Sequence, residues 1–168
     1  MPKNRKTAWC ITAVIMAIGL VFGTVMTFNN KRQDGLAAFE EQIMPQIERA
    51  VVAAFNVRTV TSAYQSRPFD ITAIQAAEHP VDVFRYYEQL YHDVWDVFEG
   101  MENVNMSDTN RNFLNIYHRN FVEIDLILSQ AGYNRIAEEF NNARDSNSNL
   151  SIIARPFVGV LPRFDVFE

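Results

Sequence analysis

The sequence predicts an all-α protein, in which a single N-terminal transmembrane helix is followed by an antiparallel up-and-down four-helix bundle and an irregular apolar C-terminal tail. Residues 8–28 carry no charge. Between residues 35 and 144, apolar side chains recur at spacings of three and four, the period of one helix face. The tail combines apolar side chains with Pro and Gly, which prevent a regular helix. We therefore expect a basic flank at 1–7, a membrane span at 8–28 and a helical domain at 29–168.

The uncharged stretch from Ala8 to Phe28 is twenty-one residues long. A helix of this length spans about 31 Å, which matches the hydrocarbon core of a bilayer. A cleaved signal peptide is the alternative, but signal sequences have shorter apolar regions, and Val21-Phe22-Gly23 is a poor cleavage site. A retained membrane anchor is therefore expected.

Two features of the span concern its packing and its orientation. Gly19 and Gly23 form a small-xxx-small pair, which lets two spans pack closely, although glycine is also frequent in spans generally. The basic residues near the span are Lys3, Arg5 and Lys6 before it and Lys31 and Arg32 after it. By the positive-inside rule, this small bias places the N-terminus in the cytoplasm and the domain on the opposite side of the membrane.

Long helices with short interruptions are expected in the domain. The first covers residues 35–66 and contains Pro45, which removes a backbone hydrogen bond and predicts a kink or a fresh helix start near Met44. A short helix follows, and the His79-Pro80 pair ends it. Pro80 suits the first turn of the next helix.

The helix that begins at Pro80 carries the most regular apolar stripe of the chain. Its positions alternate at spacings of three and four: Val83, Tyr87, Leu90, Val94, Val97 and Met101. The last long helix is capped by Ser107 or Asp108 and extends to about Arg144, but its stripe changes phase near Gly132. This change predicts either a kink or a helix that turns to a different neighbour.

Residues 145–150, which are polar except for Leu150, predict a loop before the tail. Pro156, Gly159 and Pro162 exclude one regular helix in the tail. Its other residues are too apolar for a solvated terminus. The tail is therefore expected either to cover the bundle or to bind a partner.

Charge is distributed unevenly along the chain. The net charge is −5, but residues 29–168 hold twenty acidic against twelve basic residues, which gives this part −8. Nucleic-acid binding needs clustered Lys and Arg, so no nucleic-acid partner is expected. The single cysteine, Cys10, excludes an internal disulfide and a multi-cysteine metal site.

No set of residues predicts catalysis. The three histidines do not cluster, and the sequence contains no Gly-x-Ser-x-Gly, Walker-type or dinucleotide-binding motif. Glu88 and His92 share a helix face with a spacing that can hold a metal, but exposed pairs of this kind are common on bundles. We therefore expect no catalytic residue, no metal site and no cofactor.

Several short segments occur with the order and spacing of a known family. They are the segments 43–47 and 112–114, Glu123, the pair Tyr133-Asn134, Asn141, the segment 148–150 and the segment 164–168. In these positions the sequence resembles the LemA family of bacterial membrane-anchored helical proteins. The corresponding family motifs include Leu-Ile-Pro-Asn-Leu, a Glu followed by Tyr-Asn, a Ser-Asn-Leu loop and a Phe-Phe-Glu ending. Phe140 and Gln130 depart from the family pattern, which has Tyr and Arg there.

The resemblance implies a four-helix up-and-down bundle behind one span and no established reaction. It also implies a short N-terminus outside the cell, the reverse of the charge-based orientation, so the orientation stays open. The candidates for structural or interaction roles are Pro45, Glu123, Tyr133, Asn134, Asn141, Asn149, Phe164 and Phe167. Buried asparagine amides need hydrogen bonds, so these asparagines are expected to fix the path of the tail; a binding surface is the alternative.

Together these observations predict a non-enzymatic, membrane-anchored scaffold. Its expected partners are the lipid bilayer, a second copy of the chain or another membrane protein, in membrane organisation or remodelling. One alternative is an accessory or regulatory subunit of a membrane protease or envelope enzyme. Another, of a different class, is a helical-bundle enzyme with an unrecognised site.

Overall fold

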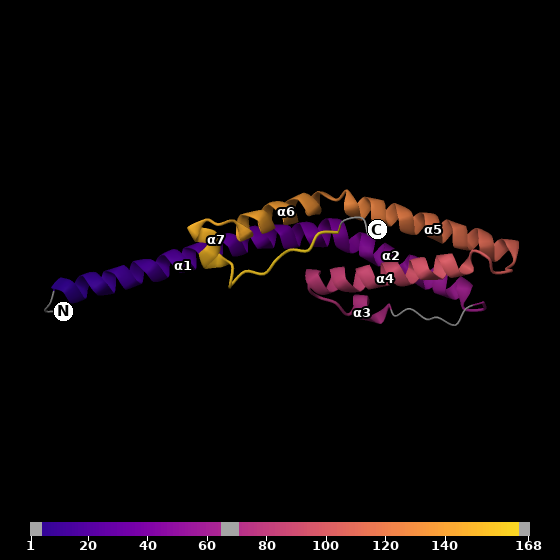
Figure 1. The fold of residues 1–168 in the computed structure, drawn as a ribbon, viewed down its shortest axis with the longest axis horizontal. Coiled ribbons are helices and arrows are strands. Elements are labelled where there is room, and N and C mark those ends of the chain that lie inside the picture. Colours follow the sequence, from indigo (N-terminus) through magenta and orange to yellow (C-terminus); the bar gives the residue numbers. More distant parts are fainter. Residues whose placement is uncertain (1–4, 65–70, 165–168) are drawn as a thin grey trace.

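The computed structural model describes residues 5–64 and 71–164, so Phe167 lies outside the described residues. The protein is 81% helical, and no strand occurs among the described residues, which confirms the predicted all-α class. The helices are α1 (Arg5–Ala38), the π-helical turn η1 (Phe39–Ile43), α2 (Met44–Thr61), α3 (Thr72–Gln75), α4 (Pro80–Met101), α5 (Asp108–Ser129), α6 (Gly132–Asp145) and α7 (Asn149–Ala154). They form an elongated molecule (Figure 1).

One continuous helical rod, in which the π-helical turn η1 joins α1 to α2, runs through the molecule (Figure 1). Near the N-terminus this rod is long and apolar enough to cross a membrane, and almost none of its most apolar part is buried inside the protein. The predicted long apolar N-terminal helix is therefore confirmed. It continues into the domain without a linker, because α1 extends past Phe28 to Ala38.

The interruption predicted near Met44 is one turn of π-helix. In η1 the backbone N–H of Met44 donates to the carbonyl oxygen of Phe39, five residues earlier. The ring of Pro45 has no N–H to donate and would clash with the preceding turn of a regular α-helix, and the wider π-turn makes room for it. α2 therefore begins at Met44 and has Pro45 in its first turn.

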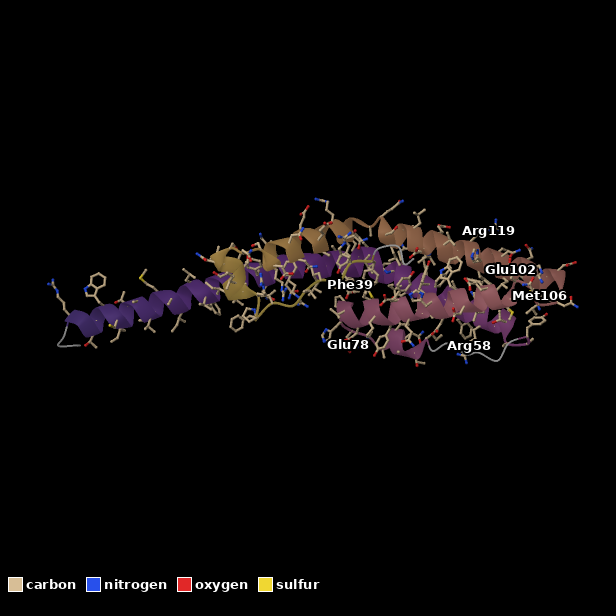
Figure 2. The ribbon with its side chains drawn as sticks, viewed as in Figure 1. Phe39, Arg58, Glu78, Glu102, Met106 and Arg119 are labelled. Atoms are coloured by element: carbon tan, nitrogen blue, oxygen red, sulfur yellow. The ribbon has the colours of Figure 1, made fainter. Side chains whose placement is uncertain are left out.

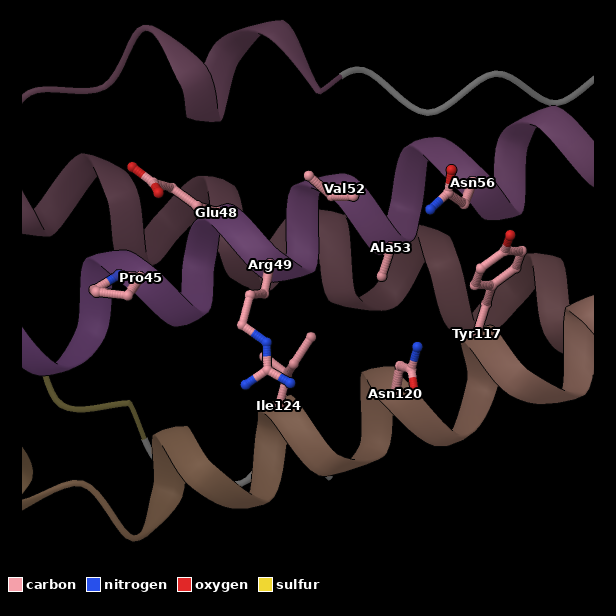
Figure 3. A pocket seen from close by; sticks show the side chains of 9 residues that line it. All are labelled: Pro45, Glu48, Arg49, Val52, Ala53, Asn56, Tyr117, Asn120 and Ile124. Carbon is pink, nitrogen blue, oxygen red and sulfur yellow. The ribbon is translucent and has the colours of Figure 1, made fainter.

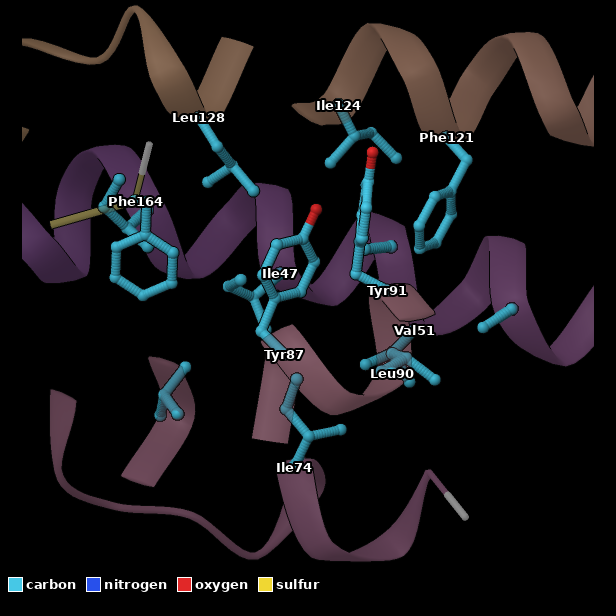
Figure 4. Close-up of a cluster of buried hydrophobic side chains, with 14 of the residues drawn as sticks. Ile47, Val51, Ile74, Tyr87, Leu90, Tyr91, Phe121, Ile124, Leu128 and Phe164 are labelled. Atoms are coloured by element: carbon cyan, nitrogen blue, oxygen red, sulfur yellow. The ribbon is translucent and has the colours of Figure 1, made fainter. Parts of the chain in front are cut away.

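α2, α4 and α5 pack side by side and enclose the main hydrophobic core (Figure 4). Every apolar position of the predicted α4 stripe is buried, which confirms that face. The labelled core residues on these three helices are Ile47, Val51, Tyr87, Leu90, Tyr91, Phe121, Ile124 and Leu128. Burial of each such side chain stabilises the fold by about 1.5–3 kcal/mol, so this cluster is a main source of stability.

Apolar and charged side chains separate between the interior and the surface. Figure 2 shows Phe39 near the middle of the molecule, where its ring is buried between helices. Arg58, Glu102 and Arg119 are exposed on the outer surface. The charged residues of the domain are therefore largely solvated.

α2 and α4 run in the same direction, and α5 runs opposite to both (Figure 1). Asn110 at the start of α5 donates a hydrogen bond to the Tyr64 hydroxyl, just after α2. Arg111 donates to the carbonyl oxygens of Glu102 and Val104, just after α4. The ends of α2 and α4 thus meet the start of α5, and the regular up-and-down alternation of four helices is not confirmed.

The predicted last helix is divided into α5 and α6. Ser107 caps α5 by accepting a hydrogen bond from the N–H of Asn110 at 3.3 Å. α5 ends at Ser129 and α6 begins at Gly132, with Ala131 outside the helical region between them at φ −60° and ψ 136°. Both alternatives predicted from the phase change occur, because the helix is interrupted and its neighbour changes from α2 to α1.

Candidate functional site

The tail is held against its own chain by three side chains on one face of α6, Asn134, Asn141 and Arg144, which we call the tail clasp. The Nδ2 group of Asn141 donates to the carbonyl oxygen of Leu161 at 2.7 Å, and its Oδ1 accepts from the N–H of Leu161 at 3.1 Å. The Nε group of Arg144 donates to the carbonyl oxygen of Val158 at 2.7 Å. These bonds satisfy backbone groups that an irregular segment cannot pair within itself.

Asn134 is the buried end of the tail clasp. Its Nδ2 lies 2.8, 3.0 and 2.9 Å from the carbonyl oxygens of Leu128, Ser129 and Phe164, and its Oδ1 accepts from the N–H of Phe164 at 2.8 Å. The amide has two hydrogens, so three carbonyl groups share them. The Asn134 side chain therefore caps the C-terminal end of α5 and also fixes the tail.

Phe164 is fully buried at the centre of an aromatic cluster. Its ring centroid lies between 5.3 and 6.2 Å from the rings of Phe39, Phe84, Tyr87 and Tyr133. Aromatic pairs at these separations contribute energy beyond the area they bury. The tail is therefore fixed by apolar contact as well as by hydrogen bonds.

Every third residue from Val158 to Phe164 faces inward. Val158, Leu161 and Phe164 are buried, whereas Phe157 and Val160 are exposed. A period of three is the repeat of polyproline II, which suits a segment that contains Pro and Gly. The buried side chains cover the chain's own helices, which is the first of the two roles predicted for the tail. Among these five residues, the second role, binding a partner, is open only to Phe157 and Val160.

Gln42 in η1 caps the start of α6 across the molecule. Its Oε1 accepts a hydrogen bond from the backbone N–H of Tyr133 at 2.8 Å. A Cβ on Gly132 would lie 3.2 Å from the same oxygen, so glycine lets this side chain approach. The ring of Tyr133 is buried, and its hydroxyl has no hydrogen-bond partner among the described residues.

Pro45 and Glu123 lie away from the tail clasp, at an open groove between α2 and α5 (Figure 3). Figure 3 shows Arg49 extending from α2 toward Ile124 on α5. The groove has a volume of about 440 Å³ and is lined by Pro45, Glu48, Arg49, Val52, Ala53, Asn56, Tyr117, Asn120 and Ile124. At its rim the Arg49 Nη2 lies 3.7 Å from the Glu123 Oε1, and this exposed pair contributes little stability.

The three remaining candidates are exposed. Asn149 begins α7, but the cap of that helix is Ser148, whose hydroxyl accepts from the N–H of Ser151 at 3.1 Å. Gly19 and Gly23 lie in open space, because a Cβ on either would meet no atom within 4 Å. The described candidates thus fall into four places: the tail clasp with its aromatic cluster, the α2–α5 groove, the start of α7 and the apolar part of α1.

Asp125 is a buried acid among the core residues of α5. It is 7% exposed, and its Oδ1 has no hydrogen-bond partner among the described residues. Burial raises the pKa of the Asp125 carboxyl from its ordinary value of 3.8 to about 6. Its place in the spacing Phe121, Ile124, Asp125, Leu128 is the signal by which the sequence could reveal it.

We expect the free energy of unfolding to fall by about 1.4 kcal/mol between pH 5 and pH 7.5 through Asp125 alone. Because its pKa is raised in the folded state, the folded protein holds this proton more tightly than the unfolded chain, and that stabilisation is lost as the pH rises through about 4–6. Urea unfolding of the full chain in detergent micelles, followed by circular dichroism, measures the change. Asp125→Asn should lose this pH dependence, and Glu123→Gln, an exposed acid on the same helix, should keep it. Equal pH dependence in Asp125→Asn and the parent would contradict the prediction.

Groups of three or more His, Cys, Asp or Glu close enough to hold a metal ion do not occur within residues 5–64 and 71–164. Glu88 and His92 are exposed on α4. Cys10 is a free, exposed thiol in the apolar part of α1.

Comparisons of the chain with protein-family models, curated proteins and solved structures found no match.

Proposed function

We propose that the protein is a single-pass membrane scaffold of the LemA type, which acts without catalysis by association with a second copy or with another membrane protein. The observation that carries this proposal is the apolar part of α1. The stretch from Ala8 to Phe28 is uncharged and almost entirely unburied, so its side chains need lipid or another protein around them. The order of the motifs supports the relation to LemA. The resemblance to LemA supports a bacterial inner-membrane location, and the basic flank supports an N-terminus inside and a domain outside.

The position of the glycine pair supports association between spans. Phe157 of the tail lines a hollow with Ala17, Ile18, Val21, Phe22 and Val25 of α1. At about 100° per residue, Gly19 and Gly23 lie about 150° around the helix axis from the middle of this hollow. The glycine face is therefore left open by the chain's own tail, and small residues let another helix approach closely.

Replacing both glycines by leucine is expected to weaken self-association about tenfold, because the added side chains separate the two backbones. The measurement is the mass of the detergent-solubilised full chain by light scattering over a range of protein-to-detergent ratios. Ala13→Leu is the control, since Ala13 lies about a quarter of a turn from the glycines. A parent protein that is monomeric at every ratio would rule out self-assembly, and an assembly that survives the double substitution would rule out the glycine face.

The α2–α5 groove favours the second candidate, an accessory subunit of a membrane protease or envelope enzyme. The groove is open and combines apolar side chains with Arg49 and Asn120, a lining that suits an extended peptide. A monomeric chain that copurifies with one membrane enzyme in fixed ratio would support this candidate over self-assembly. The four-helix bundle also belongs to the LemA proposal; the packing of α2 against α4 and α5 supports it, whereas the parallel directions of α2 and α4 depart from up-and-down alternation.

A further inference from the structure

Residues 149–160, which we call the membrane-proximal turn, lie beside the apolar part of α1. Figure 1 shows α7 at the end of the helical domain nearest the N-terminus, beyond which α1 continues alone. Phe157 lines a hollow together with Ala17, Ile18, Val21, Phe22 and Val25. None of these side chains is polar, so the membrane-proximal turn and the predicted span share one apolar surface.

Large apolar side chains of the membrane-proximal turn are exposed rather than packed on the protein. Their exposed fractions are 51% for Leu150, 56% for Ile152, 66% for Phe157 and 42% for Val160. Burying a side chain of this size contributes about 1.5–3 kcal/mol, so burying all four in lipid hydrocarbon can hold the membrane-proximal turn at a bilayer.

The height of Phe157 along α1 matches the boundary of a bilayer. The hollow spans residues 17–25, and its middle lies about seven residues before Phe28. At 1.5 Å per residue, Phe157 is therefore about 10 Å inside the end of the uncharged stretch. Interfacial segments place their apolar face about 5–10 Å into the boundary between headgroups and acyl chains.

The charges around the membrane-proximal turn suit a lipid surface. The membrane-proximal turn contains Arg155 and no acidic residue, in a domain that is acidic overall. Arg155 is partly neutralised by Asp145, at 3.6 Å. Arg32 lies at the same end of the domain, within 3.8 Å of the position that a Cβ on Gly159 would take. Apolar side chains bordered by basic ones are typical of segments that lie in the membrane interface.

We propose that the membrane-proximal turn inserts into the bilayer leaflet that faces the helical domain, where its four exposed apolar side chains contact acyl chains. This inference rests on the proposed function, because it requires that α1 crosses the same bilayer. Lipid is assigned as the partner of these exposed side chains, because the apolar surface of the turn is continuous with that of the span and lies away from the glycine face. The domain then has two attachments to the membrane, the span and the turn.

The test uses the full chain in vesicles of phosphatidylcholine and phosphatidylglycerol, with Cys10→Ser as background. A single cysteine is introduced by Phe157→Cys or Val160→Cys and labelled with an environment-sensitive fluorophore. Val14→Cys reports on the span, and Val122→Cys on the exposed side of α5 reports on water. Each label is quenched either by lipids that carry a doxyl group near the headgroup or by aqueous iodide. Unchanged circular dichroism shows that each labelled variant is folded.

Labels at 157 and 160 are expected to be quenched several-fold more by the doxyl lipid than the label at 122, and several-fold less by iodide. Iodide quenching at 157 and 160 with a lipid-protected label at 14 would overturn the insertion of the turn and leave the span intact. Protection from both quenchers would also overturn it, since another protein surface would then cover the turn. Iodide quenching at 14 would defeat the membrane span and the inference together.

Discussion

Phe164→Ala is expected to lower the free energy of unfolding by about 4 kcal/mol, the largest effect of any single substitution considered. Its ring is fully buried among four other aromatic rings, so truncation removes the apolar transfer energy and leaves a cavity that the surrounding helices fill only in part. Urea unfolding of the full chain in detergent micelles, followed by circular dichroism, measures the loss.

Phe55→Ala is the matched control for this substitution. Phe55 is on α2 and exposed, so the same chemical change there is expected to cost less than about 0.5 kcal/mol. A second readout is trypsin cleavage after Arg163, which should speed up in Phe164→Ala because the bond to residue 164 becomes accessible. Similar losses of stability for Phe164→Ala and Phe55→Ala would contradict the burial of the tail.

Asn134→Leu is expected to lower the free energy of unfolding by about 3 kcal/mol, although leucine is more apolar and forms helices more readily. The substitution removes four hydrogen bonds and leaves the carbonyl groups of Leu128, Ser129 and Phe164 without that donor in a buried place. The same urea titration measures this loss. Trypsin cleavage after Arg163 again reports on release of the tail.

Asn142→Leu provides the comparison on the same helix. Asn142 is exposed, so this substitution should leave stability within about 0.5 kcal/mol of the parent. Asn134→Asp extends the test, because a carboxylate in place of the amide would face three carbonyl oxygens and should destabilise most at neutral pH. If Asn134→Leu proved as stable as Asn142→Leu, the tail clasp would not hold the tail.

The helices of this protein could be predicted because their signal is local. The α4 stripe from Val83 to Met101 needs only the 3.6-residue period to be recognised, and all of its positions are buried. The relative direction of α2 and α4 could not be predicted in this way, because an apolar stripe is the same whichever way the helix points. Pro45 located the interruption of the first helix, but the form of that interruption, a π-turn, depends on how the backbone widens around the ring.

The candidate site was predictable where a residue was unusual for its surroundings. Asn134 stands beside an apolar stripe, where an unpaired amide is costly, and this draws attention to it without revealing its partners. Arg144 and Gln42 gave no such signal, because long polar side chains are common on helix surfaces. The partner of Gln42 is the backbone of Tyr133, 91 residues away. A contact of that kind exists only once the chain has folded.

The rod formed by α1, η1 and α2 has a mechanical consequence for a chain anchored at one end. From Phe28 to Thr61 it extends about 50 Å at 1.5 Å per residue, with no linker in which rotation could be absorbed. A change of 10° in the tilt of the anchored part would therefore move the far end by about 9 Å, which makes the rod a lever. Bilayer thickness, which influences the tilt of a spanning helix, would then be converted mainly into a sideways displacement of the far end of the domain over the membrane surface.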